Sequence, residues 1–215
     1  MKRYPLFRAK LFCFKRKFPN YSYNFSQIEN GSIILGNSAT YSNNHADIIK
    51  KLDSIMKLNN MIFVPLGYGS GGSVYINQLK FLIKDSKHHF KFLTDFIPKD
   101  EYFSMLSNSP FMISGVLRQQ SMANINFAIR NAVKIFFFKD SDVYKYLKSK
   151  GYIVFAIEDI DDKSFLKPLT YDEGLHNYNL NKNEIEELNG IYDSTIDEWL
   201  YEKEMSFEEN NCQAN

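Results

Sequence analysis

Short apolar runs alternate along this chain with segments in which apolar residues recur at helical spacing. Strands that alternate with helices over short loops are typical of a parallel sheet with right-handed crossovers. We therefore expect an α/β fold built on a Rossmann-like, doubly wound parallel sheet. The expected strands are residues 32–35, 61–66, 89–93, 111–114, 134–138 and 152–156.

The segments between these strands carry helix signals. Asn43 or Asn44 can cap the first helix, Pro98 suits the first turn of another, and Gly151 ends a third. The helix that Gly151 ends is expected over residues 140–150, and further helices are expected over 74–83, 119–131 and 182–203. We expect one ligand-binding domain over residues 31–205, a basic, aromatic lead-in or interdomain connector over 1–30, and a frayed tail over 206–215.

Composition narrows the classes of function. The chain has 215 residues, enough for one sizeable core, and its formal net charge of +1 gives no support to nucleic-acid binding. Two cysteines near opposite ends, without a CxxC pattern, suggest a reducing compartment. No N-terminal apolar segment resembles a signal peptide, and no run approaches the roughly 20 residues that span a bilayer. We expect a cytoplasmic protein.

Residues 2–17 combine basic and aromatic side chains. This segment suits contact with anionic lipid on the inner face of the cell membrane. An interdomain connector or a disordered start explains the same composition equally well.

Small and polar residues follow the first expected strand at the point where a helix begins. Gly36, Asn37 and Ser38 come directly after the strand, and His45 lies at the helix start. In doubly wound folds the carboxyl ends of strands host ligands, and N–H groups at helix starts hold anions such as phosphate. We assign Asn37, Ser38 and His45 to a ligand site; a polar loop with a helix cap is the alternative. Neither a dinucleotide G-x-G-x-x-G fingerprint nor a Walker motif is present.

A glycine-rich loop, residues 67–72, follows the second expected strand. Glycine permits a tight turn or the close approach of a ligand to the backbone. We assign Gly67 and Tyr68 to the same site, because a tyrosine there can stack on a base or a sugar. A loop that is merely flexible is the alternative.

The sharpest chemical signal follows the fourth expected strand. Arg118 offers a planar, permanently charged fork that matches a diphosphate, and Gln119 and Gln120 add two amides. The positive end of the helix dipole at this point also favours binding of a diphosphate. Asn124 lies about one helical turn further on and can reach the same crevice. An arginine that caps a neighbouring helix is the alternative.

No strong metal site is evident in the sequence. Asp140 and Asp142 form a DxD-like string, but they lie where a helix cap belongs. His88 and His89 lack a third ligand at metal-site spacing. We therefore expect ligand binding without a metal or other cofactor, and the sequence offers no Ser-His-Asp or Cys-His nucleophile set.

Five short segments resemble, in order, glycosyltransferase family 56, the 4-alpha-L-fucosyltransferase family, over roughly residues 31–155. The motifs are Gly36-Asn37-Ser38, Asn43-Asn44-His45, Val64-Pro65-Leu66-Gly67-Tyr68, Phe96-Ile97-Pro98-Lys99-Asp100-Glu101-Tyr102 and Arg118-Gln119-Gln120. The resemblance implies a two-domain glycosyltransferase of the GT-B type. Its carboxyl-terminal domain binds the nucleotide sugar, and its amino-terminal domain binds a lipid-linked acceptor. This chain resembles the carboxyl-terminal half, so any general base is expected on the other domain.

The resemblance further implies transfer of an N-acetylfucosamine-type or fucose-like sugar from a TDP-sugar to a polyprenyl-diphosphate-linked glycan, as in enterobacterial common antigen synthesis. Arg118 would stabilise the leaving diphosphate by fixed positive charge. Two alternatives stay open at this point. One is a non-catalytic nucleotide-binding or partner-binding remnant of a truncated transferase, and the other is a GT-B-like transferase with a different donor.

Overall fold

The computed structural model describes residues 21, 31–55, 58–161 and 163–212. The lead-in expected over residues 1–30 lies outside the described residues apart from Tyr21. Contacts divide the chain into two units, and residues 21–181 form the one that contains the sheet. Of the other unit, residues 1–20 and 182–215, the structure describes the helix that ends at Cys212. The expected boundary between residues 205 and 206 falls within that helix.

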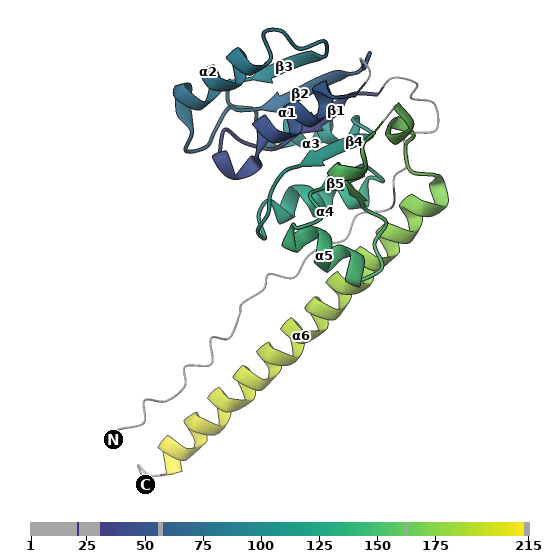
Figure 1. Cartoon of the computed structure of the whole chain (residues 1–215). Coiled ribbons are helices and arrows are strands. Elements are labelled where there is room, and N and C mark those ends of the chain that lie inside the picture. Colours follow the sequence, from purple (N-terminus) through teal and green to yellow (C-terminus); the bar gives the residue numbers. More distant parts are fainter. Residues whose placement is uncertain (1–20, 22–30, 56–57, 162, 213–215) are drawn as a thin grey trace, which may run out of the picture. The chain divides into compact units, whose positions relative to one another are not determined.

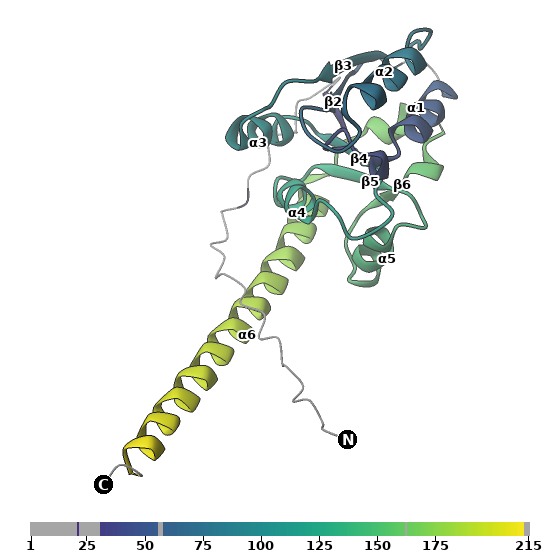
Figure 2. The same ribbon diagram turned by 90° about the vertical axis from the view of Figure 1, so that its left-hand side faces the viewer.

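The strands of the described chain form one sheet in the order β3-β2-β1-β4-β5-β6, and all five pairings are parallel. This is the doubly wound, Rossmann-like order, so the predicted fold class is confirmed. The strands are β1 (Ile33–Leu35), β2 (Met61–Pro65), β3 (His89–Leu93), β4 (Phe111–Ser114), β5 (Lys134–Phe137) and β6 (Phe155–Ala156). Figure 1 labels β1 to β5, and Figure 2 labels β6.

Helices cover both faces of the sheet. α1 (His45–Asp53) and α2 (Gly72–Leu82) lie on one face, and α3 (Lys99–Ser107), α4 (Met122–Arg130) and α5 (Asp142–Ser149) pack on the other (Figure 2). Successive strand residues point to opposite faces. In β1, Ile33 and Leu35 join the core beneath α1 and α2, whereas Ile34 joins the core beneath α3, α4 and α5. Burial on both faces explains why β1 is apolar throughout.

Several element boundaries differ from those expected. α4 begins at Met122 because Ser121 adopts a left-handed conformation with φ of 60° and interrupts the helix. β6 is reduced to Phe155–Ala156. Three short 3-10 helices, Tyr41–Asn43, Ile157–Asp159 and Lys163–Leu166, complete the described connections.

The last helix, α6 (Tyr171–Cys212), begins well before the expected residue 182. Its start is a reciprocal capping box: the Thr170 N–H donates to Glu173 Oε2 at 2.8 Å, and the Glu173 N–H donates to Thr170 Oγ1 at 3.2 Å. This threonine-to-glutamate spacing is a recognised helix-start signal.

Candidate functional site

The candidate site lies between β1 and β4, where the sequence order of the strands in the sheet changes direction. β2 and β3 lie on one side of this pair, and β5 and β6 lie on the other. At such a switch point the loops at the carboxyl ends of the two strands diverge and leave a crevice for ligands. The β1 loop (residues 36–44) and the β4 loop (residues 115–121) occupy this position.

Two hydrogen bonds join these loops. The Asn44 Nδ2 donates to the Gly115 carbonyl at 2.7 Å, and the Ser42 hydroxyl donates to Gln120 Oε1 at 2.9 Å. A Cβ on Gly115 would lie 2.1 Å from the Asn43 carbonyl oxygen, so only glycine allows the approach. Asn44 occupies the cap position of α1, but its side chain bonds Gly115 and not the helix. The predicted cap position, Asn44, is therefore confirmed, although its side chain makes no cap hydrogen bond to α1.

The β1 loop is closed by its own polar groups. Asn43, fully buried, accepts from the Asn37 N–H at 3.2 Å and donates to both the Ser38 carbonyl and the Ser38 hydroxyl at 3.1 Å. The Ser38 hydroxyl also pairs with Thr40 Oγ1 at 3.0 Å. Because the Ser38 hydroxyl is bonded within the loop, the Ser38 side chain has no polar group left to contact a ligand.

The glycine-rich β2 loop packs directly on the β1 loop. The Ala39 N–H donates to the Tyr68 carbonyl at 2.6 Å, and the Gly71 N–H donates to the Ala39 carbonyl at 2.7 Å. Gly69 has a φ of 126°, and a Cβ there would lie 2.7 Å from the Ala39 carbonyl carbon. In this structure the glycines allow the β1 and β2 loops to pack closely, because glycine has no side chain and can adopt a positive φ.

His45 lies beneath the β1 loop with none of its surface exposed. Its Nδ1 pairs with Tyr75 Oη at 2.8 Å, while Nε2 has no hydrogen bond of good geometry to a described residue. Burial lowers the pKa of His45 to about 4, and the Leu35 backbone offsets part of that effect. The ring is therefore neutral at pH 7 and supports the loop from below.

The β4 loop has the opposite character. Arg118 is exposed, and within the described chain its guanidinium has no hydrogen bond or ion pair, so it caps no helix among those residues. Three residues later, the hydroxyl of Ser121 is buried without a partner, although Ser121 stands at the cap position of α4. Within the described part of the chain no side chain caps α4, so its first N–H groups and the positive end of its dipole lie at this edge without a side-chain acceptor.

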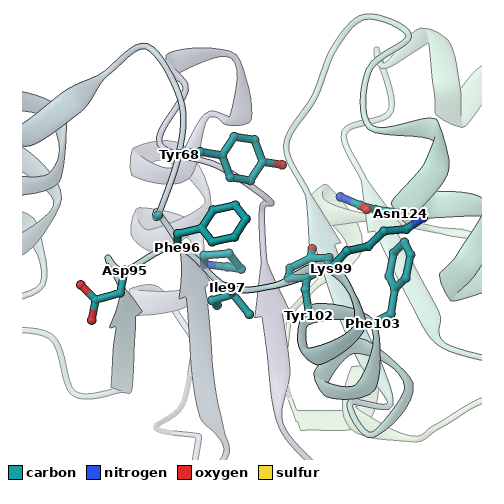
Figure 3. A pocket seen from close by; sticks show the side chains of 10 residues that line it. Tyr68, Asp95, Phe96, Ile97, Lys99, Tyr102, Phe103 and Asn124 are labelled. Carbon is teal, nitrogen blue, oxygen red and sulfur yellow. The ribbon is translucent and has the colours of Figure 1, made fainter.

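A cavity of about 210 Å³ opens beside these loops at the same edge of the sheet (Figure 3). The β2 loop, the segment between β3 and α3, and α3 and α4 supply its walls. Tyr68 and Phe96 face Tyr102 and Asn124 across it in Figure 3. The lining residues are Pro65, Gly67, Tyr68, Asp95, Phe96, Ile97, Lys99, Tyr102, Phe103 and Asn124.

The cavity contains one buried polar atom without a partner. Tyr102 Oη makes no hydrogen bond to a described residue, and burial together with the nearby Tyr68 hydroxyl raises the pKa of Tyr102. Opposite it, Tyr68 is fixed by the Asn37 Nδ2, which donates to Tyr68 Oη at 3.0 Å. Asn37 thus acts on the cavity through Tyr68.

The residues assigned to the site from sequence all lie in the loops at the carboxyl edge or in the helix turns next to them, but they do not share one cavity. Gly67, Tyr68 and Asn124 line the 210 Å³ cavity, and Gln119 lines a separate one of about 300 Å³ next to α5. Arg118 is exposed, and Gln120 is held by Ser42. Asn37, Ser38 and His45 are almost fully buried, so direct contact with a ligand would require the β1 loop to rearrange.

Sequence reasoning did not assign Phe96, Lys99, Tyr102 or Ser121 to the site. The first three belong to the segment 96–102 that carried part of the family resemblance, so a signal for them was present. Nothing in the sequence shows that Ser121 adopts a left-handed conformation and buries its hydroxyl.

The DxD-like string is part of a helix start. Ser141, between the two aspartates, caps α5 by accepting from the Tyr144 N–H at 3.4 Å, and Lys145 pairs with Asp140 at 3.4 Å. The cap is thus Ser141 and neither aspartate.

Among the residues that the structure describes, no group of three or more His, Cys, Asp or Glu side chains could hold a metal ion. Nor does any helix within those ranges have the length and apolarity to cross a membrane.

Comparison with solved structures agrees with the fold. The Candida albicans trehalose-6-phosphate phosphatase N-terminal domain superposes with a TM-score of 0.52 at 8% sequence identity. The match covers 80% of this chain and 42% of that chain, so this chain spans less than half of its relative. At this identity the likeness concerns the fold alone.

The family comparison is more specific. The model of 4-alpha-L-fucosyltransferase glycosyl transferase group 56 matches residues 2–171. This range includes every loop of the site and extends beyond the 31–155 range of the motifs. The chain therefore belongs to the 4-alpha-L-fucosyltransferase family, glycosyl transferase group 56.

Proposed function

We propose that this chain binds the nucleotide-sugar donor of a fucosyltransferase-type glycosyltransferase. The donor is a TDP-sugar carrying an N-acetylfucosamine-type or fucose-like hexose, and the acceptor is a polyprenyl-diphosphate-linked glycan. Family membership supports the reaction class. The observation that carries the assignment of the site is Arg118, exposed and unpaired among the described residues, in the loop that leads to the uncapped start of α4.

The diphosphate is the part of the donor that this loop suits. A guanidinium presents parallel N–H donors that match two phosphate oxygens. The first N–H groups of α4 add uncharged donors and the positive end of the helix dipole. Gln119 and Gln120 follow Arg118, and their amide N–H groups can orient phosphate or sugar oxygens.

Transfer of the sugar forms a bond between its anomeric carbon and a hydroxyl oxygen of the acceptor, whose proton goes to a base outside the described residues. The bond from the anomeric carbon to the diphosphate oxygen breaks, and negative charge grows on that oxygen. Fixed positive charge at Arg118 stabilises this charge in the transition state. We propose that Arg118 and the α4 start do this without a metal ion. TDP binding should then be unchanged by EDTA, and an absolute need for Mg²⁺ or Mn²⁺ would redirect attention to Asp140 and Asp142.

A lipid-linked acceptor places the reaction at the inner face of the membrane. We propose that the protein works there from the cytoplasm as a peripheral protein and that the acceptor is bound outside residues 31–181.

Calorimetric titration with TDP and with thymidine tests the assignment. Arg118→Lys keeps the charge but loses the fork, so we expect TDP binding to weaken by about 1–3 kcal/mol while the fold is retained. Thymidine, which has no phosphate, should bind parent and variant alike. Arg130→Lys is the matched control, because Arg130 is the other described arginine and lies at the opposite end of α4.

TDP binding by Arg118→Lys at parental affinity would overturn the assignment of Arg118. TDP binding without sugar transfer by the full protein would favour a non-catalytic nucleotide-binding module.

A further inference from the structure

We propose that the cavity between Tyr68, Phe96, Tyr102 and Asn124 holds the pyrimidine base of the donor nucleotide. The inference deepens the proposed function and rests on it, because it assigns a second part of the same ligand to a second place at the carboxyl edge. It concerns residues that the diphosphate assignment does not use.

The walls of the cavity suit a flat ring. Phe96 is 75% exposed and Tyr68 is 58% exposed, and both rings line the cavity from the same side in Figure 3. Exposed aromatic rings at a cavity offer π-faces on which a base can stack. The Asn37 amide fixes Tyr68, so its ring is held in place before the ligand arrives.

Two polar groups in the cavity lack a partner among the described residues. The buried Tyr102 hydroxyl and the Asn124 amide make no hydrogen bond there, whereas the Tyr68 hydroxyl is held by Asn37. A buried hydroxyl without a partner is costly, and a ligand that supplies one removes that cost. A pyrimidine base presents carbonyl oxygens and an imide N–H at its edge, which one hydroxyl and one amide can satisfy. A deoxyhexose presents hydroxyls around its whole ring, whereas the exposed aromatic rings of this cavity suit a flat ring.

The size of the cavity indicates a single ring. Its volume of about 210 Å³ lies below the roughly 300–1,000 Å³ of pockets that enclose whole drug-sized ligands. The base would thus enter the cavity, while the ribose and diphosphate stay outside.

The cavity is also connected to the diphosphate site. Asn124 lies in the first turn of α4, and the uncapped start of the same helix follows Arg118. The first turn of α4 therefore contributes to both the cavity and the diphosphate site. The order of base, ribose and diphosphate in a nucleotide can follow that element from Asn124 towards Arg118.

Calorimetric titration of the full chain with TDP and with inorganic pyrophosphate tests the inference. Phe96→Ala removes an exposed ring, so the fold is kept, and TDP should bind roughly 5- to 150-fold more weakly. Tyr102→Phe removes only the hydroxyl, and TDP should bind roughly 2- to 12-fold more weakly. Neither change should alter pyrophosphate binding. Phe81→Ala, which removes an equally exposed ring from α2, is the matched control.

Thermal unfolding gives a readout that a purely structural role would not produce. Without ligand, Tyr102→Phe should unfold at the parental temperature or above, because the variant loses a buried group that has no partner. A lower unfolding temperature would mean that the hydroxyl is bonded within the protein, and would overturn its role towards the base.

Other outcomes separate this inference from the proposed function. Unchanged TDP binding by Phe96→Ala and Tyr102→Phe, with loss in Arg118→Lys, would overturn the base assignment and leave the diphosphate site standing. Weaker binding of the TDP-sugar by Phe96→Ala, with TDP unaffected, would show that the cavity holds the sugar. Absence of TDP binding by the parent protein would overturn both proposals.

Discussion

The β1 and β4 loops leave neighbouring strands at the same edge of the sheet, yet their polar groups are used in opposite ways. In the β1 loop, Asn43 bonds Asn37 and Ser38, and Asn44 bonds the neighbouring loop; among the described residues only Asn37 Oδ1 of this loop is buried without a partner. In the β4 loop, Arg118 is unpaired within the described chain and the buried Ser121 hydroxyl has no partner.

This difference indicates a division of labour. A loop whose polar groups are paired internally loses stability when one of them is removed. Strained residues and buried groups without a partner lower the stability of a loop, and they are found mostly at ligand-binding sites. We therefore expect changes in the β1 loop to alter stability and changes in the β4 loop to alter binding.

The largest effect is expected for Asn43→Ala. This change leaves the buried Asn37 N–H without its partner, at about 1–3 kcal/mol, and removes the bonds to the Ser38 carbonyl and hydroxyl, at about 1 kcal/mol each. The Ser38 carbonyl keeps the Thr40 N–H as a donor at 2.8 Å. The free energy of unfolding should fall by roughly 4 kcal/mol, measured by urea denaturation. Asn108→Ala is the control, because Asn108 is exposed and bonds only Ser104; its effect should stay within about 0.5 kcal/mol. Parental stability of Asn43→Ala would refute the scaffold role of this loop.

A pH titration of stability should give the next largest effect. The pKa of His45 is lowered by burial from 6.5 to about 4 in the folded chain. The unfolded chain therefore takes up the proton first as the pH falls, so His45 contributes full stability above pH 6.5 and loses it between pH 6.5 and 4. At about 1.4 kcal/mol per pH unit the loss reaches about 3 kcal/mol.

Unfolding free energies of the parent and of His45→Asn, measured from pH 7.5 to 4, check this. The parent should lose more stability over that range than the variant by about 3 kcal/mol. Parallel curves would show that His45 titrates alike in the folded and unfolded chains.

A smaller effect is expected for the two left-handed residues of these loops that are not glycine, Ser121 and Asn44. Ser121 has a φ of 60° and no side-chain partner, so Ser121→Gly should raise stability by about 1 kcal/mol and weaken TDP binding. Asn44 has a φ of 49° and bonds Gly115, so Asn44→Gly loses that bond and should gain nothing. Denaturation midpoints measure both changes. Equal gains in the two variants would remove the contrast between the loops.

Much of the fold followed from the sequence. The continuous apolar run of β1 and the helical spacing in α1 were enough to place them, because their burial determines their residue types. The start of α6 was missed although the Thr170–Glu173 spacing marks it. The start of α4 was missed because a left-handed serine is set by tertiary contacts and leaves no pattern in the sequence.

The site was less predictable than the fold. Residue type and position placed Arg118, Tyr68 and Asn124 at the carboxyl edge. Exposure could not be read from the sequence, because Asn37 and His45 carry the same chemistry whether they face solvent or support a loop. The pairing of Asn43 with Ser38 decides that question, and this is a tertiary contact.

A paired measurement on Arg118→Ala and Ser38→Ala tests the division of labour most directly. TDP affinity by calorimetry and unfolding free energy by urea are measured on the parent and on both variants. Arg118→Ala should lose about 3 kcal/mol of TDP binding at parental stability. Ser38→Ala should lose about 1 kcal/mol of stability and bind TDP within about twofold of the parent. Parental TDP binding by Arg118→Ala, or an equal loss of binding by Ser38→Ala, would contradict the assignment of the β4 loop to the donor and of the β1 loop to the scaffold.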